Sequence, residues 1–350
     1  MKNIIPNFIK AAVLFKLKKK LKIINLKYPG LKRGQVLVKI FYSSICRSQL
    51  MEINGGRDNK KWLPHLLGHE GSGKVISIGK GVKKVKVNDD VILTWIKGQG
   101  IDSVNPTYNF GNKIINAGKV TTFSNYSIVS ENRLIKKPKH INYKQACLLG
   151  CCFMTGPGMV FNETNPKKKN KIVLIGLGAV GLGALLALKE KKIDTIIVIE
   201  KNKAKRNLAK RLGVKLTISK ITNKSEQKIY KLFKGKADIC YESAGLIKTL
   251  EFAIKIVKNN GLVHFASHPD KDLSLRIKPY EFILGKKITG SWGGKAVPEK
   301  NIKKFSKLIL KNKKIINNIL NKEYKLDNIN RGIYDFSEGK LFKPIIKMSH

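Results

Sequence analysis

The chain has 350 residues, 42% of them hydrophobic, and a formal net charge of +47 at pH 7. This length allows one large domain or two ordinary ones with a sizeable core, which excludes a disordered tail. No run of 18 apolar residues occurs, so no transmembrane helix is predicted. Lysines interrupt the apolar patch near the N-terminus, which we interpret as a first strand and not as a signal peptide.

The basic charge does not by itself indicate a nucleic-acid-binding protein. Only eight of the 70 basic residues are arginines, and the lysines are spread over the whole length. Specific phosphate and base contacts favour arginine. We therefore expect no specific nucleic-acid partner and no membrane partner, and only weak adhesion to polyanions at low salt. The five cysteines are scattered and odd in number, which indicates a reducing cytoplasm.

The hydrophobic pattern changes along the chain. From about residue 10 to 150, segments such as "QVLVKIFYSSI" and "GSGKVISIG" alternate apolar and polar residues with period two, which predicts half-buried strands of a barrel or sandwich. From about residue 170, apolar strands alternate with helices, which predicts a parallel sheet with helices on its faces. We expect the boundary near "CFMTGPGMVFNE".

A glycine motif opens the second half. In "IGLGAVG", Gly176, Gly178 and Gly181 match G-x-G-x-x-G between a strand and a helix, the arrangement that lets backbone approach a pyrophosphate. Glu200 ends the next predicted strand, 19 residues beyond Gly181, where an acid would accept hydrogen bonds from ribose hydroxyls. A purely structural glycine turn is the alternative.

Three further segments contain metal-ligand residue types: Cys46 in "SSICRSQL", His69 in "LLGHEGSGKV" and Cys151 in "LLGCCFMTG". Cysteine and histidine are zinc ligands, and three protein ligands with one open position are typical of a catalytic site. The spacings of 23 and 82 residues are too long for a local metal clip. A solvated histidine beside Glu70 is the alternative.

These segments together, in order over roughly residues 10 to 345, resemble the zinc-dependent medium-chain dehydrogenases, especially their alcohol dehydrogenase branch. The resemblance implies an α/β chain. A GroES-like β-barrel catalytic domain would comprise residues 1–152 and 296–350, and a Rossmann doubly wound parallel sheet residues 153–295.

The resemblance also implies roles for individual residues. Cys46, His69 and Cys151 would bind one catalytic zinc, with Cys152 as the nearest competitor for Cys151. Glu70 would lie beside the metal, and Ser48 would hydrogen-bond the substrate oxygen. Catalytic roles fall to Ser48, Glu70 and Thr155. The expected cofactor-binding set is Arg47 near the pyrophosphate, Thr155 near the nicotinamide, Gly176, Gly178, Gly181, Glu200 and Lys205.

The sequence departs from the family in several places. Residues 96–120 contain no cysteine, so the structural zinc is not expected. Gln49 stands where an acid commonly supports the zinc histidine, and Met51 where a histidine often ends the proton relay. The basic segment around Lys60 and Lys61 hints at a polar or anionic substrate, with a solvated loop as the alternative. Trp95 and Trp292 are candidates for the substrate pocket or for the core.

The expected activity is hydride transfer between an alcohol, or an aldehyde or ketone, and NAD. NAD is favoured over NADP because a 2′-phosphate would meet the charge of Glu200, although Lys201, Lys203 and Lys205 argue the other way. The alternatives are a zinc-free quinone or enoyl reductase of the same superfamily and a noncatalytic anion-binding protein. The resemblance further implies a homodimer or homotetramer.

Overall fold

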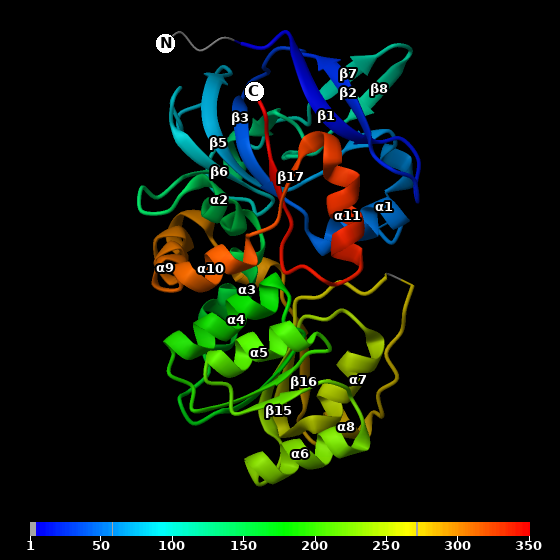
Figure 1. The fold of residues 1–350 in the computed structure, drawn as a ribbon, viewed down its shortest axis with the longest axis vertical. Coiled ribbons are helices and arrows are strands. Elements are labelled where there is room, and N and C mark those ends of the chain that lie inside the picture. Colours follow the sequence, from blue (N-terminus) through cyan, green and yellow to red (C-terminus); the bar gives the residue numbers. More distant parts are fainter. Residues whose placement is uncertain (1–4, 58, 271) are drawn as a thin grey trace. The chain divides into compact units, whose positions relative to one another are not determined.

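The computed structural model describes residues 5–57, 59–270 and 272–350, and the chain separates into two compact units. Unit 1 ends its first segment at Met154 and resumes as Val297–His350, whereas unit 2 is Thr155–Ala296 (Figure 1). Unit 1 is thus built from both ends of the chain. In the described part of the chain, no helix has both the length and the apolar character needed to cross a bilayer.

Unit 1 consists of two sheets of mainly antiparallel strands. The first sheet has the order β2-β1-β4-β8-β7, and the second has the order β10-β6-β5-β3-β18-β17 with β9 also paired to β3. The strands are β1 (Phe8–Leu14), β2 (Lys22–Lys27), β3 (Gln35–Ser44), β4 (His65–Leu66), β5 (Glu70–Ile78), β6 (Asp90–Thr94), β7 (Thr107–Phe110), β8 (Lys113–Asn116), β9 (Tyr126–Ser130), β10 (Leu134–Lys136), β17 (Glu323–Lys325) and β18 (Ile345–Lys347).

Short helices connect and cover these strands. They are α1 (Arg47–Asn54), α2 (Tyr143–Ala146), α9 (Pro298–Lys311), α10 (Lys313–Ile319) and α11 (Ile329–Ser337), with short helical turns η1 (Lys60–Trp62), η2 (Glu131–Arg133), η3 (Cys147–Gly150) and η6 (Leu326–Asn328). Helix α3 (Cys152–Gly158) crosses the unit boundary.

Strand β3 is the centre of unit 1. It pairs with β5, β9 and β18, so the two chain segments that make up the unit meet on this strand. Val36, Val38 and Ile40 from alternate positions of β3 are fully buried in one core cluster, as the period-two pattern predicts. The β18 pairing places the C-terminal segment beside the end of β3, with Ile45 N–H donating to Pro344 O at 3.1 Å. This end of β3 leads directly into Cys46.

The segment without cysteines forms the β7–β8 hairpin, and two carboxylates fix the loop before it. Glu131, which is 2% exposed, accepts hydrogen bonds from the backbone N–H groups of Lys83, Lys84 and Ile101 at 2.6–2.7 Å. Glu299 accepts from Gln99 N–H at 2.9 Å. Burial by itself raises the pKa of Glu131, but these amide donors hold it below its usual range. Carboxylate-to-amide bonds therefore stabilise this loop.

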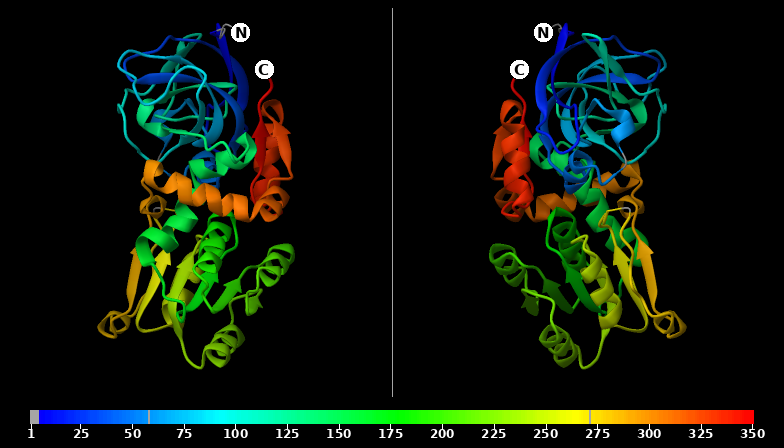
Figure 2. Two further views of the ribbon diagram at one scale, coloured as in Figure 1. Left: turned by 90° about the vertical axis from the view of Figure 1, so that its left-hand side faces the viewer. Right: turned by 90° about the vertical axis from the view of Figure 1, so that its right-hand side faces the viewer.

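Unit 2 is a single parallel sheet with the strand order β13-β12-β11-β14-β15-β16. Numbered from its first strand, this is the order 3-2-1-4-5-6 of a doubly wound dinucleotide-binding domain. Figure 2 shows helices alongside the sheet. The elements are η4 (Met159–Thr164), β11 (Lys171–Ile175), α4 (Ala179–Glu190), β12 (Thr195–Ile199), α5 (Lys203–Arg211), β13 (Leu216–Ile218), α6 (Asn223–Phe233), β14 (Ala237–Glu242), α7 (Ile247–Ile256), β15 (Val257–Phe265), α8 (Tyr280–Ile283), β16 (Lys287–Gly290) and η5 (Gly293–Lys295).

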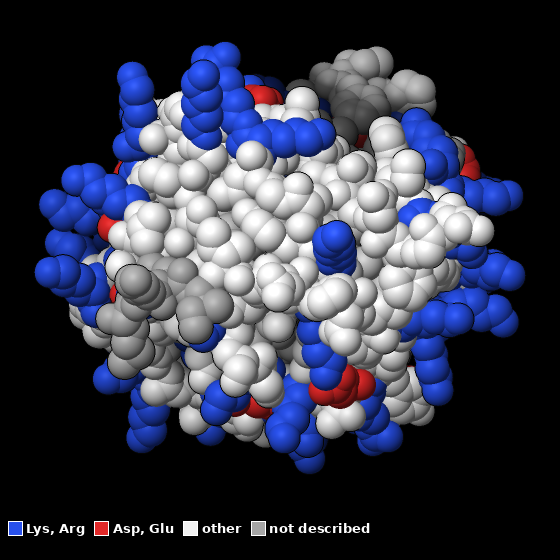
Figure 3. All heavy atoms as spheres, turned by 90° about the horizontal axis from the view of Figure 1, so that it is seen from above, with Lys and Arg blue, Asp and Glu red and all other residues white. Residues whose placement is uncertain are grey.

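The central strands of this sheet are apolar on both faces. In β11, "KIVLI", the last four residues are at most 2% exposed, which is the composition expected when helices cover both faces. The two sheets of unit 1 and the parallel sheet of unit 2 agree with the strand-rich half and the doubly wound half predicted from sequence. Figure 3 shows one face of the molecule. Lysine and arginine side chains project outward around the rim of this face, and few acidic side chains are visible among them.

Candidate metal and cofactor sites

Cys46 lies where β3 gives way to α1. The residue has extended backbone angles, φ −103° and ψ 156°, and is the N-cap of α1, so its side chain lies at the amino end of the helix. Ser48 follows within the first turn, and its Oγ is buried without a hydrogen-bond partner. Arg47 is the first residue of α1 and is exposed. The strand end and the helix start together place Cys46 and Ser48 on the same turn.

His69 and Glu70 lie at the start of β5. The glycine before them makes the tight turn into this strand possible. Gly68 has φ +87°, and a Cβ there would come within 2.5–2.9 Å of Thr122 and Phe123. A side chain at this position would therefore clash, so the turn requires glycine at residue 68. The "GHEGSGKV" segment thus folds into the tight entry to β5.

Cys151 follows the helical turn η3 and approaches the same point through another glycine. A Cβ on Gly150 would lie 2.6 Å from Cβ of Glu70 and 2.4 Å from Leu93 O. Glycine at 150 therefore permits η3 to pack directly on the start of β5. Cys152, the nearest competitor, is buried, with its Sγ directed to Leu148 O at 3.5 Å.

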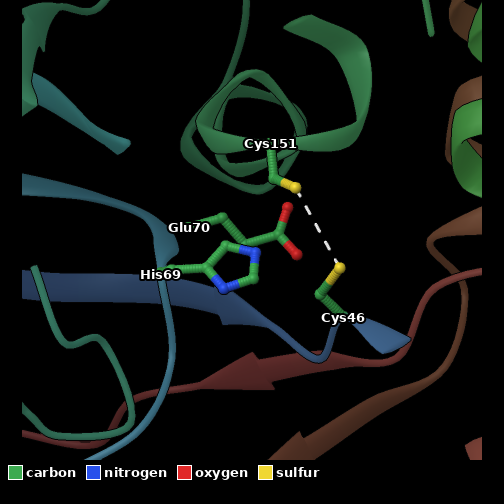
Figure 4. Close-up of side chains that lie close together, drawn as sticks. All are labelled: Cys46, His69, Glu70 and Cys151. Atoms are coloured by element: carbon green, nitrogen blue, oxygen red, sulfur yellow. Dashed lines mark hydrogen bonds between the residues drawn. The ribbon is translucent and has the colours of Figure 1, made fainter. Parts of the chain in front are cut away.

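The side chains of Cys46, His69, Glu70 and Cys151 converge, as Figure 4 shows. One ligand atom from each lies within 4.8 Å of those from all the others, and the two sulfur atoms are 4.0 Å apart. Nε2 of His69 is buried and has no hydrogen-bond partner. Two sulfur atoms and one imidazole nitrogen are the donor set that zinc prefers.

The electrostatics of this donor cluster favour one thiolate in the metal-free state. A hydrogen bond from Cys151 holds the pKa of Cys46 well below its usual value, and the same contact raises that of Cys151. Burial raises the pKa of Cys147 to about 12, so that thiol stays neutral. Cys147 and Cys240 are both fully buried. Only Cys46 and Cys151 have their sulfur atoms in the cluster.

A lysine that sequence reasoning missed pairs with Glu70. The Nζ of Lys343 donates to Oε1 of Glu70, and the two side chains are 2% and 0% exposed. Burial, the largest single effect, lowers the pKa of Lys343, but the Glu70 carboxylate together with the nearby Cys152, Cys46 and Cys151 raises it well above its usual value. Glu70 is therefore engaged by an ammonium group from the C-terminal segment, while its Oε2 has no partner.

Gln49 contacts His69 directly. Its Oε1 accepts a hydrogen bond from Cys46 N–H at 3.0 Å, and its Nε2 lies 2.5 Å from Nδ1 of His69. The sequence indicated the loss of a supporting carboxylate at this position. The structure shows that a neutral amide occupies the same place.

The predicted glycine turn forms in unit 2. Gly176 has φ +86°, and a Cβ on Gly181 would lie 2.2 Å from Gly176 O, so both positions require glycine. A Cβ on Gly178 would meet no atom within 4 Å, so the space outside the turn is open. Gly178 is also the N-cap of α4 and offers no side-chain cap, which leaves helix N–H groups available for an anion.

Glu200 lies just after β12 and reaches the glycine turn. Its carboxylate accepts hydrogen bonds from Leu177 N–H at 2.7 Å and from Asn202 N–H at 2.9 Å. These bonds fix the carboxylate, and each oxygen keeps a lone pair for a further donor. Lys205, on α5, is buried, and Arg206 donates to the carbonyl oxygen of Glu200 at 2.8 Å. Arg206 was not among the residues expected at this strand end.

The remaining candidates are divided between the units. Thr155 belongs to α3 and unit 2 and is buried. Trp95 is half-buried and packs against the core of unit 1. Trp292 is 66% exposed, so the interpretation of this residue as core is wrong.

Comparisons with known proteins identify both units. Residues 32–139 match the model of the alcohol dehydrogenase GroES-like domain, and residues 179–321 match the model of the zinc-binding dehydrogenases. The two models describe the two halves of one class of oxidoreductase, which pairs a GroES-like domain with a Rossmann domain. The chain belongs to the zinc-dependent medium-chain alcohol dehydrogenase family.

Individual relatives match over most of the chain. The chain is 27% identical over 316 residues to an S-(hydroxymethyl)glutathione dehydrogenase of Synechocystis sp., covering 81% of this chain and 85% of that protein. It is 25% identical to one of Haemophilus influenzae, covering 96% of each. The crystal structure of benzyl alcohol dehydrogenase from Acinetobacter calcoaceticus superposes with a TM-score of 0.87 at 26% identity, covering 98% of this chain and 99% of that chain. The chain is thus an oxidoreductase of the zinc alcohol dehydrogenase type.

Proposed function

We propose that this enzyme transfers hydride between a polar or anionic alcohol and NAD with one catalytic zinc bound by Cys46, His69 and Cys151. The convergence of these donors within 4.8 Å carries the proposal. Two thiolates on one tetrahedral zinc with bonds of about 2.3 Å would lie about 3.8 Å apart, close to the 4.0 Å between these sulfur atoms. The residues present therefore fit a zinc ion.

When bound, zinc would polarise the alcohol oxygen and lower its pKa. The chain's own groups would then complete the site. Ser48 has a buried hydroxyl with no partner, so it can form a hydrogen bond with a substrate hydroxyl and hold its oxygen in place. Glu70 would contribute negative charge beside the metal while Lys343 keeps one of its oxygens engaged.

We propose a single zinc because carboxylates stabilise the loop before the β7–β8 hairpin without any cysteine. Glu131 and Glu299 bind four backbone N–H groups between Lys83 and Ile101. In this proposal unit 1 is the catalytic domain and unit 2 the cofactor domain.

The cofactor assignment rests on the glycine turn of unit 2. The open space outside Gly178 and the uncapped N-terminus of α4 suit a pyrophosphate. Glu200 suits the ribose hydroxyls of NAD because it is fixed beside the turn and has acceptor capacity left. We further propose that Arg47 and Lys205 contact the cofactor and that Thr155 adjoins the nicotinamide, as the family resemblance implies.

Wild-type enzyme is expected to prefer NAD over NADP by about 10- to 150-fold in kcat/KM, the effect of a like charge facing a 2′-phosphate. Glu200→Ala should narrow this preference, and a matched control, Glu226→Ala on α6, should leave it unchanged. Steady-state kinetics with both cofactors checks this. Equal or better use of NADP by the wild type would contradict the assignment.

The substrate test is a dehydrogenase assay of the purified protein with a panel of compounds. It should include S-(hydroxymethyl)glutathione and benzyl alcohol, which the relatives' names suggest, with simple aliphatic alcohols and sugar nucleotides. We expect turnover with at least one polar or anionic alcohol and about one zinc per chain by elemental analysis. Turnover of quinones or enoyl substrates by zinc-free protein would favour the reductase alternative. Absence of any turnover would favour the noncatalytic one.

Gln49→Glu is expected to raise zinc affinity about tenfold. A His69 that binds metal through Nε2 carries its remaining proton on Nδ1, which needs an acceptor. In its observed orientation Gln49 places Oε1 on Cys46 N–H and turns its Nε2–H donor toward Nδ1, so it offers the Nδ1 proton no acceptor, whereas a carboxylate of the same length has one oxygen for each donor. Competition with a chromophoric chelator measures the affinity. Met51→Glu adds the same charge to α1 as a control, and an equal gain there would attribute the effect to charge alone.

We also propose a homodimer joined along β16. This strand lies at the edge of the sheet of unit 2, and the neighbouring α8 exposes Tyr280, Phe282 and Ile283 by 47–77%. Sedimentation at micromolar concentration should show a dimer, and Ile283→Asp should shift it toward monomer. A monomeric wild type would contradict this proposal.

A reducing cytoplasmic location is also proposed. It is supported by the Cys46 and Cys151 thiols, whose sulfur atoms lie close enough to be at risk of oxidation in a metal-free chain.

A further inference from the structure

A groove in unit 1, outside the metal site, lies between the β1–β2 turn and the β7–β8 hairpin. Its volume is about 940 Å³, and an adjoining hollow of about 490 Å³ shares Phe15, Lys22 and Lys113 with it. We call the two together the lysine groove. Figure 1 shows β1, β2, β7 and β8 close together in this unit. The main groove is lined by Phe15, Lys16, Lys18, Lys19, Lys20, Leu21, Lys22, Pro64, Lys113 and Ile114.

The lysine groove is far more basic than the chain as a whole. Six of the ten residues that line its main part are lysines, whereas basic residues make up one fifth of the sequence. Among the residues that the structure describes, no acidic one lines either part. Within the described residues, none of these six lysines forms an ion pair with a carboxylate. Each ammonium group is therefore available to a ligand anion.

The floor of the groove is apolar and partly aromatic. Phe15 and Phe110 pack edge to face with ring centroids 6.2 Å apart, and the ammonium groups of Lys22 and Lys113 lie 5.6 and 5.8 Å from the Phe15 ring centroid. Phe110 is 38% exposed and Ile114 is 60% exposed. The groove therefore combines exposed apolar surface with positive charge.

The backbone around the groove is fixed by contacts to the rest of unit 1. Lys18 N–H donates to Ile53 O at 2.6 Å, at the end of α1, and Leu17 packs against the core. On the other side, Asn116 Nδ2 donates to Trp62 O at 2.9 Å. Because the framework is fixed, an occupant would not have to order these segments on binding.

We propose that the lysine groove binds single-stranded nucleic acid without sequence preference. Lysines neutralise phosphates as point charges, and the exposed ring of Phe110 in the adjoining hollow can stack on a base of any identity, which is the combination found in nonspecific single-strand sites. The described residues that line the groove include no arginine and, as an amide, Asn112 alone, so they do not supply the bidentate groups that read base edges. Binding of this kind agrees with the absence of a specific nucleic-acid partner expected from the sequence.

Other occupants fit the groove less well. A duplex is too wide to bring its bases to the Phe110 floor. A second copy of this chain, with 70 basic and 23 acidic residues, would bring mostly like charge. An acidic peptide would satisfy the lysines but would not need two aromatic rings on the floor. The duplex and the acidic peptide are separate outcomes of the test below.

The test measures binding of the full-length zinc-loaded protein to a fluorescein-labelled short oligothymidylate by fluorescence anisotropy over a series of salt concentrations. The triple variant Lys19→Gln, Lys20→Gln, Lys113→Gln removes three charges from the groove. The charge-matched control Lys167→Gln, Lys168→Gln, Lys169→Gln removes three exposed charges from unit 2. Circular dichroism and zinc content verify that each variant is folded.

We expect the groove triple variant to lose at least about tenfold in affinity at low salt and to reduce the slope of log K against log salt by about 2, near 0.7 per lost phosphate contact. The control should change affinity less than about twofold. Phe110→Ala should weaken oligothymidylate binding several-fold but leave binding of inorganic polyphosphate unchanged, because only the former has bases to stack.

Three results would overturn the proposal. Equal losses in the two triple variants would show diffuse adhesion over the whole surface. Tighter binding of a polyglutamate peptide of the same charge would assign the groove to acidic peptides. Tighter binding of a duplex would exclude recognition through stacked bases. The dehydrogenase proposal depends on none of these outcomes.

Discussion

Cys46→Ser is expected to lose its bound zinc and its alcohol dehydrogenase activity while its affinity for NAD changes little. Serine keeps the size of the side chain but replaces a thiolate by a hydroxyl, which is a poor zinc ligand at neutral pH. Loss of the metal removes several kcal/mol of transition-state stabilisation, so turnover should fall by about 10³-fold or more. NAD affinity should persist because the glycine turn and Glu200 belong to unit 2.

The measurements are elemental analysis, turnover and a cofactor titration on the same preparations. Cys152→Ser is the matched control, because this thiol is adjacent to Cys151 in sequence but is directed to Leu148 O. It should keep its zinc and its activity. Full metal content in Cys46→Ser, or loss of zinc in Cys152→Ser, would contradict the ligand assignment.

The fold was predictable because its hydrophobic periods are strong. Strand β3 alternates buried valines and isoleucines toward one core, and β11 is a continuous apolar run followed by a glycine turn, so each period indicated the correct class of sheet. The turn itself was predictable because Gly176 and Gly181 have steric reasons to be glycine. The local sequence was therefore sufficient to predict those features, strands and glycine turns, that depend on residues close together in the chain.

The candidate site was predictable from sequence only in part. Cys46, His69 and Cys151 could be named because their residue types are those of zinc ligands, and their neighbouring glycines, Gly68 and Gly150, leave room for the approach. Lys343 could not be named, because one lysine among so many carries no signal and its partner Glu70 is 273 residues away. Its position follows from the pairing of β18 with β3, which no local pattern indicates.

The contact between Gln49 and His69 was only partly predictable from the sequence. The sequence showed that a carboxylate was missing, and it could not show that the amide would still reach Nδ1 of His69. The spacing of nearby residues indicated that Gln49 lies on α1. Its hydrogen bond to His69, however, depends on where β5 begins beside that helix.

Lys343→Met is expected to destabilise the metal-free protein by about 3–5 kcal/mol at neutral pH, the cost of leaving a buried carboxylate without its partner. Glu70 and Lys343 have side chains that are 0% and 2% exposed, so water cannot replace the lost ammonium group. Methionine fills a similar volume, so little stability is lost through an internal cavity. Denaturant unfolding in the presence of a chelator measures the change.

The destabilisation should depend on pH in a direction that identifies its cause. Burial raises the pKa of Glu70, and Lys343 opposes that rise, so the variant should have a folded-state pKa further above the unfolded value of about 4.3. A raised carboxyl pKa means that the folded state binds more protons, so stability falls as pH rises from the unfolded pKa through the folded one. The loss in free energy of unfolding, relative to wild type, should therefore be small near pH 5 and grow toward pH 8. The double variant Glu70→Gln, Lys343→Met removes both charges and should recover more than half of the loss. A deficit that is independent of pH and persists in the double variant would show that Lys343 acts through packing alone.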